Sequence, residues 1–157
     1  SEFKESLLTV RYRAGEISYQ NRKHFFTDWI NYNSASVVDC TELLGQGRAV
    51  CAEKILNNKD DGSLYLQGVP CVQRDVVYIP SKDIDKTVLQ SLRTGDYIGV
   101  YSELPGLDVS HVGIFIKNGE ASYLRHASRR QGKVIDEDFM SYIKNTPGIV
   151  VLRPEGE

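Results

Sequence analysis

Short apolar runs separated by turn signals dominate the chain after residue 70, and this pattern is typical of β-strands. Residues 72–80 (VQRDVVYIP), 97–103 (YIGVYSE) and 148–154 (GIVVLRP) contain the β-branched and aromatic residues that strands favour. Residues 133–137 (KVIDE) form a shorter run of the same kind. We therefore expect a sheet built mainly from this half of the chain.

The longest strand-like region, residues 111–128, is interrupted by Asn118-Gly119. An Asn-Gly pair is a strong signal for a two-residue hairpin turn. Folding the chain at this pair places His111 opposite residue 125 or 126. Two of the three histidines, His111 and His126, then lie at the same end of one hairpin and within side-chain reach.

Four segments have apolar residues at helical spacing, and we expect a helix in each of residues 2–12, 22–33, 81–95 and 136–146. The RAGE sequence breaks the first helix, and Ser81 or Asp83 is the expected N-cap of the third. Residues 34–62 are ambiguous, because two glycines interrupt them and the NNKDDG turn ends them. One short strand and one helical turn are expected there.

This order of elements predicts an α+β fold with a mainly antiparallel sheet. A chain of 157 residues has the length of one domain. The net charge is −2 and the basic run RHASRRQGK is short, so nucleic acid is not expected as the main partner. No apolar run approaches the roughly 18 residues that span a bilayer, and no segment has the form of a signal peptide.

The chain contains three cysteines, Cys40, Cys51 and Cys71. They form no C-x-x-C pair and no Cys/His set with zinc-ligand spacing, so a structural metal site is not expected. Small buried hydrophobic residues are the simplest interpretation of all three. One disulfide is an open alternative, and the spacing does not assign it.

A pair of neighbouring histidines can form a relay, in which one imidazole is a general base and the other holds it in the useful tautomer. His111 and His126 are the candidates for these two roles. Two structural histidines at strand ends are the alternative interpretation of the same spacing. His24 lies in an aromatic segment, and packing is its expected role.

The segment GDYIGVYSELPGLDVSHVGIFIKNGEASYLRHAS resembles the cell-wall cysteine amidases and peptidases of the NlpC type. Five ordered motifs are similar to one branch of that superfamily: RYRAGEI, R-x-HFFTDWI, PGLDVSHVGI, LRHAS-x-x-x-GKV and GIVVLRP. This branch is described as N-acetylmuramoyl-L-alanine amidase-like and was long catalogued as a domain of unknown function. The resemblance implies a papain-like core, with N-terminal helices packed on a barrel-like, mainly antiparallel sheet.

The resemblance also implies a Cys–His–His site without a cofactor, in which His111 is the general base and His126 orients it. The base takes the thiol proton, the thiolate attacks an amide carbonyl, and the resulting acyl-enzyme is hydrolysed. Cys40 in VVDCTELL is the candidate nucleophile within this chain. The family nucleophile also lies in an Asp-Cys-Thr-like motif at the start of a helix, where amide dipoles lower a thiol pKa.

Two observations count against Cys40. The family nucleophile precedes the RYRAGEI segment, whereas Cys40 follows it by about 25 residues, and Gly45 soon interrupts the helix after Cys40. We therefore expect residues 1–157 to be the C-terminal part of a larger amidase domain whose nucleophile helix lies upstream. On this interpretation the missing N-terminal segment is a partner of the chain, and the chain alone is inactive.

Further positions match the family and suggest a groove wall for an acidic peptide and a sugar: Tyr12, Arg13, Arg22, Asp108 and Ser110, together with Glu16, His24, Asp28 and Trp29. Arginine suits a carboxylate, and an aromatic face suits the apolar edge of a sugar. Packing and ion pairing are the alternative for the N-terminal positions. Asp108 and Ser110 are equally compatible with contacts at a strand entry.

The function implied by the resemblance is a peptidoglycan hydrolase that cuts the amide bond between N-acetylmuramic acid and L-alanine. Its expected partner is a peptidoglycan fragment or muropeptide, in the periplasm or after secretion. An endopeptidase that cuts within the stem peptide is the first alternative. A non-catalytic module that binds wall peptides is the second.

Overall fold

The computed structural model describes residues 2–32 and 37–155. Eight strands form one sheet: β1 (Val37–Asp39), β2 (Val50–Leu56), β3 (Val72–Pro80), β4 (Tyr97–Tyr101), β5 (Val109–Asn118), β6 (Ala121–Ser128), β7 (Lys133–Asp138) and β8 (Gly148–Pro154). Their order is β2-β3-β8-β4-β5-β6-β7, with β1 also paired to β8, and neighbouring strands run antiparallel. The predicted α+β class with an antiparallel sheet is confirmed. The sheet is open rather than a closed barrel, because β2 and β7 are its two ends.

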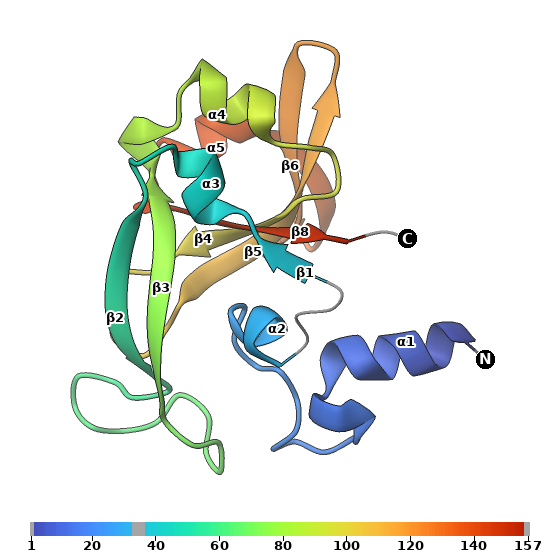
Figure 1. Cartoon of the computed structure of the whole chain (residues 1–157), viewed down its shortest axis with the longest axis vertical. Coiled ribbons are helices and arrows are strands. Elements are labelled where there is room, and N and C mark those ends of the chain that lie inside the picture. Colours follow the sequence, from blue (N-terminus) through green and yellow to red (C-terminus); the bar gives the residue numbers. More distant parts are fainter. Residues whose placement is uncertain (1, 33–36, 156–157) are drawn as a thin grey trace.

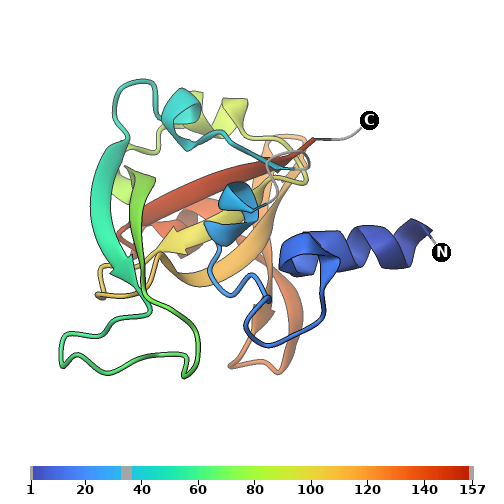
Figure 2. The same ribbon diagram turned by 60° about the horizontal axis from the view of Figure 1, so that its bottom comes forward.

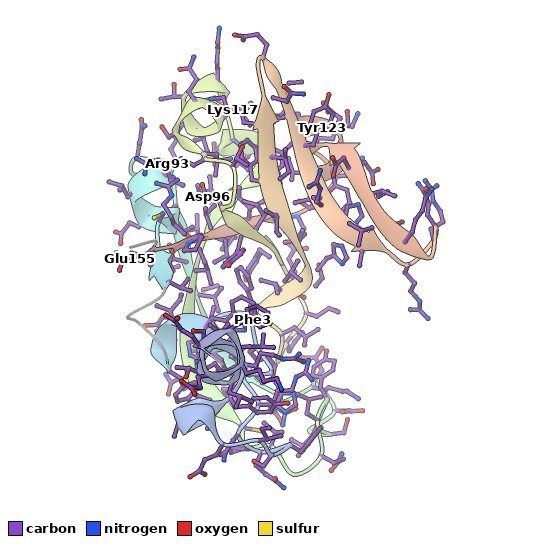
Figure 3. The ribbon with its side chains drawn as sticks, turned by 90° about the vertical axis from the view of Figure 1, so that its right-hand side faces the viewer. Phe3, Arg93, Asp96, Lys117, Tyr123 and Glu155 are labelled. Carbon is purple, nitrogen blue, oxygen red and sulfur yellow. The ribbon has the colours of Figure 1, made fainter. Side chains whose placement is uncertain are left out.

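The helices are short: α1 (Glu2–Arg11), α2 (Asp28–Asn31), α3 (Thr41–Gly45), α4 (Lys86–Ser91) and α5 (Phe139–Ile143), with 3-10 turns η1 (Arg13–Gly15) and η2 (Ser81–Asp83). Helices α3, α4 and α5 lie together over one face of the sheet, and α1 and α2 lie on the other side (Figure 1). Both termini lie on one side of the molecule (Figure 2). Helix α1 buries none of its residues, and Phe3, labelled in Figure 3, is 74% exposed.

Strand β8 is the centre of the core, with apolar side chains buried on both of its faces. Ile149 and Val151 pack with the α3–α4–α5 layer. Val150 and Leu152 pack on the opposite face with Phe26 and its neighbours. A continuous apolar run is what a strand covered on both faces requires, which explains why GIVVL could be identified as a strand from sequence.

The β5–β6 hairpin turns one residue later than predicted. Asn118 pairs with Ala121, so Gly119 and Glu120 are the two turn residues, and Gly119 has φ of 60°. Glycine at the first turn position suits a type II′ turn. Figure 3 shows this hairpin, with Lys117 and Tyr123 labelled on either side of its turn. The later turn moves the partner of every β5 residue along β6 by two positions.

The helix predicted over residues 22–33 is wrong for most of its length, and only Asp28–Asn31 is helical. Before Asp28, backbone N–H groups donate to side-chain carboxylates and not to the backbone carbonyls that would accept them in a helix. The Asp28 Oδ2 atom accepts from the Phe25 N–H at 3.2 Å, and Asp108 Oδ2 accepts from the Thr27 N–H at 2.7 Å. The predicted final residue, Asn33, lies outside the described residues.

Two other segments differ from expectation. The ambiguous segment contains two strands, β1 and β2, around the short helix α3. The helix predicted over residues 81–95 is divided into η2 and α4, and Asp85 is the N-cap of α4 in place of Ser81 or Asp83. The Asp85 carboxylate accepts from the N–H groups of Thr87 and Val88, so the helix begins where its free donors find an acceptor.

Candidate active site

A β-bulge at Ser110 determines where His111 points. Tyr101 pairs with Val109, and the adjacent residue Val100 pairs with His111, so Ser110 is an extra residue in β5. Val109 and His111 would share a face in a regular strand, but the bulge places them on opposite faces. Val109 packs with the Phe26 side of the sheet, and His111 faces the side that α5 covers.

His111 and His126 are in direct contact, which confirms their predicted proximity. Nε2 of His111 lies 2.9 Å from Nδ1 of His126, and the two ring planes are nearly perpendicular, at 86°. His126 is 7% exposed, whereas His111 is half-buried. The hydrogen bond therefore joins a fixed inner imidazole to an outer imidazole that solvent reaches.

Two further side chains complete the cluster, and sequence reasoning missed both. Nε2 of His126 lies 3.2 Å from Oε2 of Glu137 on β7. The Tyr142 ring on α5 lies 5.0 Å from the His126 ring and 6.2 Å from the His111 ring, measured between centroids. Glu137 lies two residues after Ile135 on β7, and Ile135 pairs with His126. This spacing could have identified Glu137 only if the register of β7 against β6 had been known.

The electrostatic environment keeps His111 neutral. Burial, and secondly the charge that His126 can carry, lower the pKa of His111 from its ordinary value of 6.5. A neutral imidazole with one free nitrogen is the form in which histidine accepts a proton. Burial also raises the pKa of the Tyr142 hydroxyl, with a smaller contribution from Glu137, so this ring covers the pair as a neutral group.

The structure does not bring Cys40 to the histidines. Its backbone N–H donates to the Val151 carbonyl on β8 at 3.0 Å, and β4 lies between β8 and β5. Three strand spacings of about 4.8 Å separate Cys40 from β5 by about 14 Å. Cys40 is 7% exposed in the apolar core, and this burial raises the pKa of its thiol.

The other two thiols are also remote from His111. Cys51 lies on β2, four strands away from β5 in the sheet, and Cys71 directly precedes β3. Both are exposed and free. No thiol in the part of the chain that the structure describes is therefore placed to give a proton to His111.

Three predicted substrate-binding residues belong to the N-terminal segment. Tyr12 forms an antiparallel bridge with Arg22, and the Arg13 guanidinium stacks on the Tyr32 ring at 3.8 Å. Arg22 lines a cavity of about 500 Å³ together with Val112. Val112 alternates with His111 along β5, so this cavity opens on the face of the strand opposite to the histidine pair.

Asp108 and Ser110 lie immediately before His111, and the structure gives them structural contacts. Asp108 is 2% exposed, and its Oδ2 accepts from both the N–H and the hydroxyl of Thr27, at 2.7 and 2.8 Å. The hydroxyl of Ser110 donates to the Val100 carbonyl at 3.4 Å. Asp108 therefore anchors the Thr27 segment, and it also lines the cavity that Arg22 and Val112 border.

Two further properties concern ions and membranes. In residues 2–32 and 37–155, no three His, Cys, Asp or Glu side chains are grouped closely enough to hold a metal ion. None of the described helices has the length and apolar character that a membrane crossing requires.

Comparisons with known proteins agree with the fold. A family model described as AmiA-like, N-acetylmuramoyl-L-alanine amidase-like, matches residues 1–149. A crystal structure of a Legionella pneumophila protein has a TM-score of 0.81 at 24% identity, covering 99% of this chain and 69% of that one. A crystal structure of an N-acetylmuramoyl-L-alanine amidase from Bacteroides uniformis has a TM-score of 0.77 at 25% identity, covering 97% of this chain and 73% of that one. Among curated proteins no match is found.

Proposed function

The chain belongs to the AmiA-like family of N-acetylmuramoyl-L-alanine amidase-like proteins, and we propose that it carries the general base of a cysteine amidase that acts on peptidoglycan. The observation that carries this proposal is the 2.9 Å hydrogen bond between His111 and His126, with the outer ring accessible and held neutral. Nucleophilic catalysis by a thiol needs such a base, because a free cysteine is only a few per cent thiolate at neutral pH.

The chemistry follows from the positions of the ring nitrogens. With Nε2 of His111 engaged by His126, Nδ1 is the nitrogen left to take the thiol proton. The thiolate attacks the lactyl carbonyl of N-acetylmuramic acid, and the proton on Nδ1 passes to the departing amine of L-alanine. Water then cleaves the thioester: one of its protons passes through His111 to the sulfur, the other is released to solvent, and the muramic acid leaves as a carboxylate.

The nucleophile of this proposal is a thiol from a polypeptide segment other than residues 1–157. The proposal rests on geometry, because Cys40 is separated from β5 by two strands and its pKa is raised by burial. The family resemblance places the nucleophile before the RYRAGEI segment, in a motif of the Asp-Cys-Thr kind. In this arrangement the accessible side of His111 receives a helix that begins at that cysteine.

We also place the chain in the NlpC superfamily, with a papain-like core. Support comes from the order of its parts, since SHVGI presents His111 and the later HA presents His126 from the adjacent strand. A substrate in the cell wall implies that the protein acts outside the cytoplasm. The scissile bond is taken from the family description, which names the amide between N-acetylmuramic acid and L-alanine.

Product analysis tests this function. The natural full-length polypeptide that contains this chain is incubated with a muropeptide, and the products are identified by mass spectrometry. Free N-acetylmuramic acid together with a peptide that begins at L-alanine is the expected result, and prior treatment with iodoacetamide should abolish it. Cleavage that persists after all thiols are alkylated would exclude a cysteine nucleophile.

The same assay separates two other candidates. An endopeptidase would leave L-alanine attached to N-acetylmuramic acid and shorten the stem peptide. A binding module would retain the muropeptide without cutting it. The binding module is the second candidate because Cys40 is bonded to β8 and Cys51 lies on β2, so that two and three strands, respectively, lie between these residues and β5 in the sheet.

A further inference from the structure

We propose that Glu137 is a positioning residue that fixes the direction of the hydrogen-bond chain from His126 to His111. Its carboxylate leaves Nδ1 of His111 as the free proton acceptor. The direction of this hydrogen-bond chain follows from the structure and does not depend on the proposed function. Its use in catalysis rests on the proposed function.

The direction follows from counting donors and acceptors. An ionised carboxylate accepts hydrogen bonds and donates none, so Nε2 of His126 carries a proton toward Oε2 of Glu137 at 3.2 Å. Neutral His126 then has a bare Nδ1, which must receive a proton from Nε2 of His111 at 2.9 Å. Neutral His111 is consequently left with a bare Nδ1.

The reversed chain is the arrangement that Glu137 prevents. If His126 donated from Nδ1, its bare Nε2 would face the carboxylate, and two acceptors would oppose each other. His111 would then carry its proton on Nδ1 and could not act as a base there. Because the Glu137 side chain is 44% exposed, its removal would admit water, which both donates and accepts, and the reversed chain would become accessible.

The fold sets Glu137 apart from the acidic residues on either side of it. Asp136 points to the opposite face of β7 and forms a two-pronged ion pair with Arg125, both contacts at 2.7 Å. Asp138 accepts from the Ser141 N–H at 2.8 Å and is the N-cap of α5, the helix that places Tyr142 over the imidazoles. Glu137 is the member of this acidic triplet that faces His126.

Glu137 also opposes the positive charge that the histidine pair gains during the reaction. When His111 accepts a proton on Nδ1, its Nε2 proton can move to Nδ1 of His126, whose Nε2–H group continues to donate a hydrogen bond to the Glu137 carboxylate. A hydrogen bond to a charged group strengthens this state. Water around the half-exposed carboxylate screens part of the effect, so we expect loss of Glu137 to cost about tenfold in rate.

Imidazole nitrogen NMR of this chain tests the proposal without an activity assay. The chain is labelled with nitrogen-15 and recorded at about pH 8.5, where histidine is ordinarily neutral. The wild type should give one tautomer, with the proton on Nε2, for both His111 and His126. Glu137→Ala should add signals of the reversed tautomer in both rings, while His24 stays unchanged as the internal reference.

Two variants make this experiment specific. Glu137→Gln keeps the length of the side chain, but its amide can donate as well as accept, so it should also admit the reversed tautomer, and it supplies this readout if Glu137→Ala does not fold. Glu120→Ala removes the same charge at the far turn of the β5–β6 hairpin and should change neither ring. Unchanged tautomers in Glu137→Ala, or equal effects of the Glu120 and Glu137 changes, would overturn the proposal.

Kinetics of the natural full-length polypeptide separate this inference from the proposed function. Glu137→Ala should lower kcat about tenfold with little change in KM, and Glu137→Gln should recover part of the loss. Reversed tautomers in a protein that cleaves no muropeptide would keep the role of Glu137 and refute the proposed function. Cleavage of the muropeptide by a protein whose histidine tautomers do not change in Glu137→Ala would support the proposed function and refute the role of Glu137.

Discussion

The imidazoles of His111 and His126 meet on a diagonal across the β5–β6 hairpin, with Nε2 of one 2.9 Å from Nδ1 of the other. Ile114 pairs with Arg125, so the same register places His126 opposite Gly113. A Cβ atom at Gly113 would lie 2.6 Å from Leu124 Cδ1. The missing side chain at position 113 therefore gives room to the β6 residues that hold His126 in place.

Gly113→Ala should consequently lower the free energy of unfolding by about 1–3 kcal/mol, as overpacking does in a close-packed core. The new methyl group meets the side chain and backbone of β6 rather than open solvent. Urea denaturation measures the effect. A Gly113→Ala variant as stable as the wild type would contradict this prediction, because it would show that β6 can make room for the added methyl group.

The lowered pKa of His111 predicts a pH-dependent stability. The unfolded chain binds a proton at His111 near the ordinary pKa of 6.5, whereas the folded protein binds it only at lower pH. The contribution of His111 to the free energy of unfolding is thus fully present above pH 6.5. It is lost as the pH falls from 6.5 to the pKa of His111 in the folded protein. His126, Glu137 and Tyr142 are the titratable groups around the ring.

Urea denaturation of the wild type and of His111→Ala at pH 7.5 and pH 5.5 measures this contribution. The wild type should lose more stability than the variant between the two conditions. Equal losses would show that His111 titrates alike in the folded and unfolded chains.

Cys40 should react slowly with iodoacetamide, because it is 7% exposed and burial raises the pKa of its thiol. The exposed residues Cys51 and Cys71 are internal controls and should be labelled first. Peptide mass mapping after short exposures gives the three rates, and labelling in urea should make them similar. Fast labelling of Cys40 that disappears in His111→Ala would instead identify Cys40 as the nucleophile.

The Asp96–Arg153 ion pair should stabilise the start of β4. Asp96 is 1% exposed and forms two contacts of 2.7 Å with the Arg153 guanidinium. Asp96→Ala leaves a largely buried charge without its partner and should cost about 3–5 kcal/mol. Asp136→Ala removes a similar two-pronged pair at the surface and should cost below about 1 kcal/mol. Equal costs in urea denaturation would contradict this assignment.

The sheet could be predicted from sequence where local pattern and tertiary context agree. Residues 72–80 and 148–154 are β-branched runs and became β3 and β8. The Asn118-Gly119 pair predicted the β5–β6 hairpin and the proximity of the two histidines, although the turn lies one residue later than predicted. Strand β2 was not identified as such, because VCAEKIL contains alanine, glutamate and lysine, which strands disfavour, and only pairing with β3 makes it extended.

The remaining errors come from contacts between residues far apart in sequence. Phe25, Phe26, Trp29 and Ile30 have helical spacing, but Asp108 holds Thr27 across 81 positions and prevents a long helix. Glu137 was missed for a related reason, since its role depends on the register of β7 against β6. Pattern alone does not supply either contact.

The rate of muropeptide hydrolysis by His111→Ala, compared with wild type and Glu120→Ala in the natural full-length polypeptide, tests the central claim most directly. Glu120 lies in the turn of the β5–β6 hairpin, at the end of the hairpin away from His111. We predict that His111→Ala folds and has no measurable activity, whereas Glu120→Ala keeps the wild-type rate. Hydrolysis by a folded His111→Ala variant at a rate near that of the wild type would contradict the account.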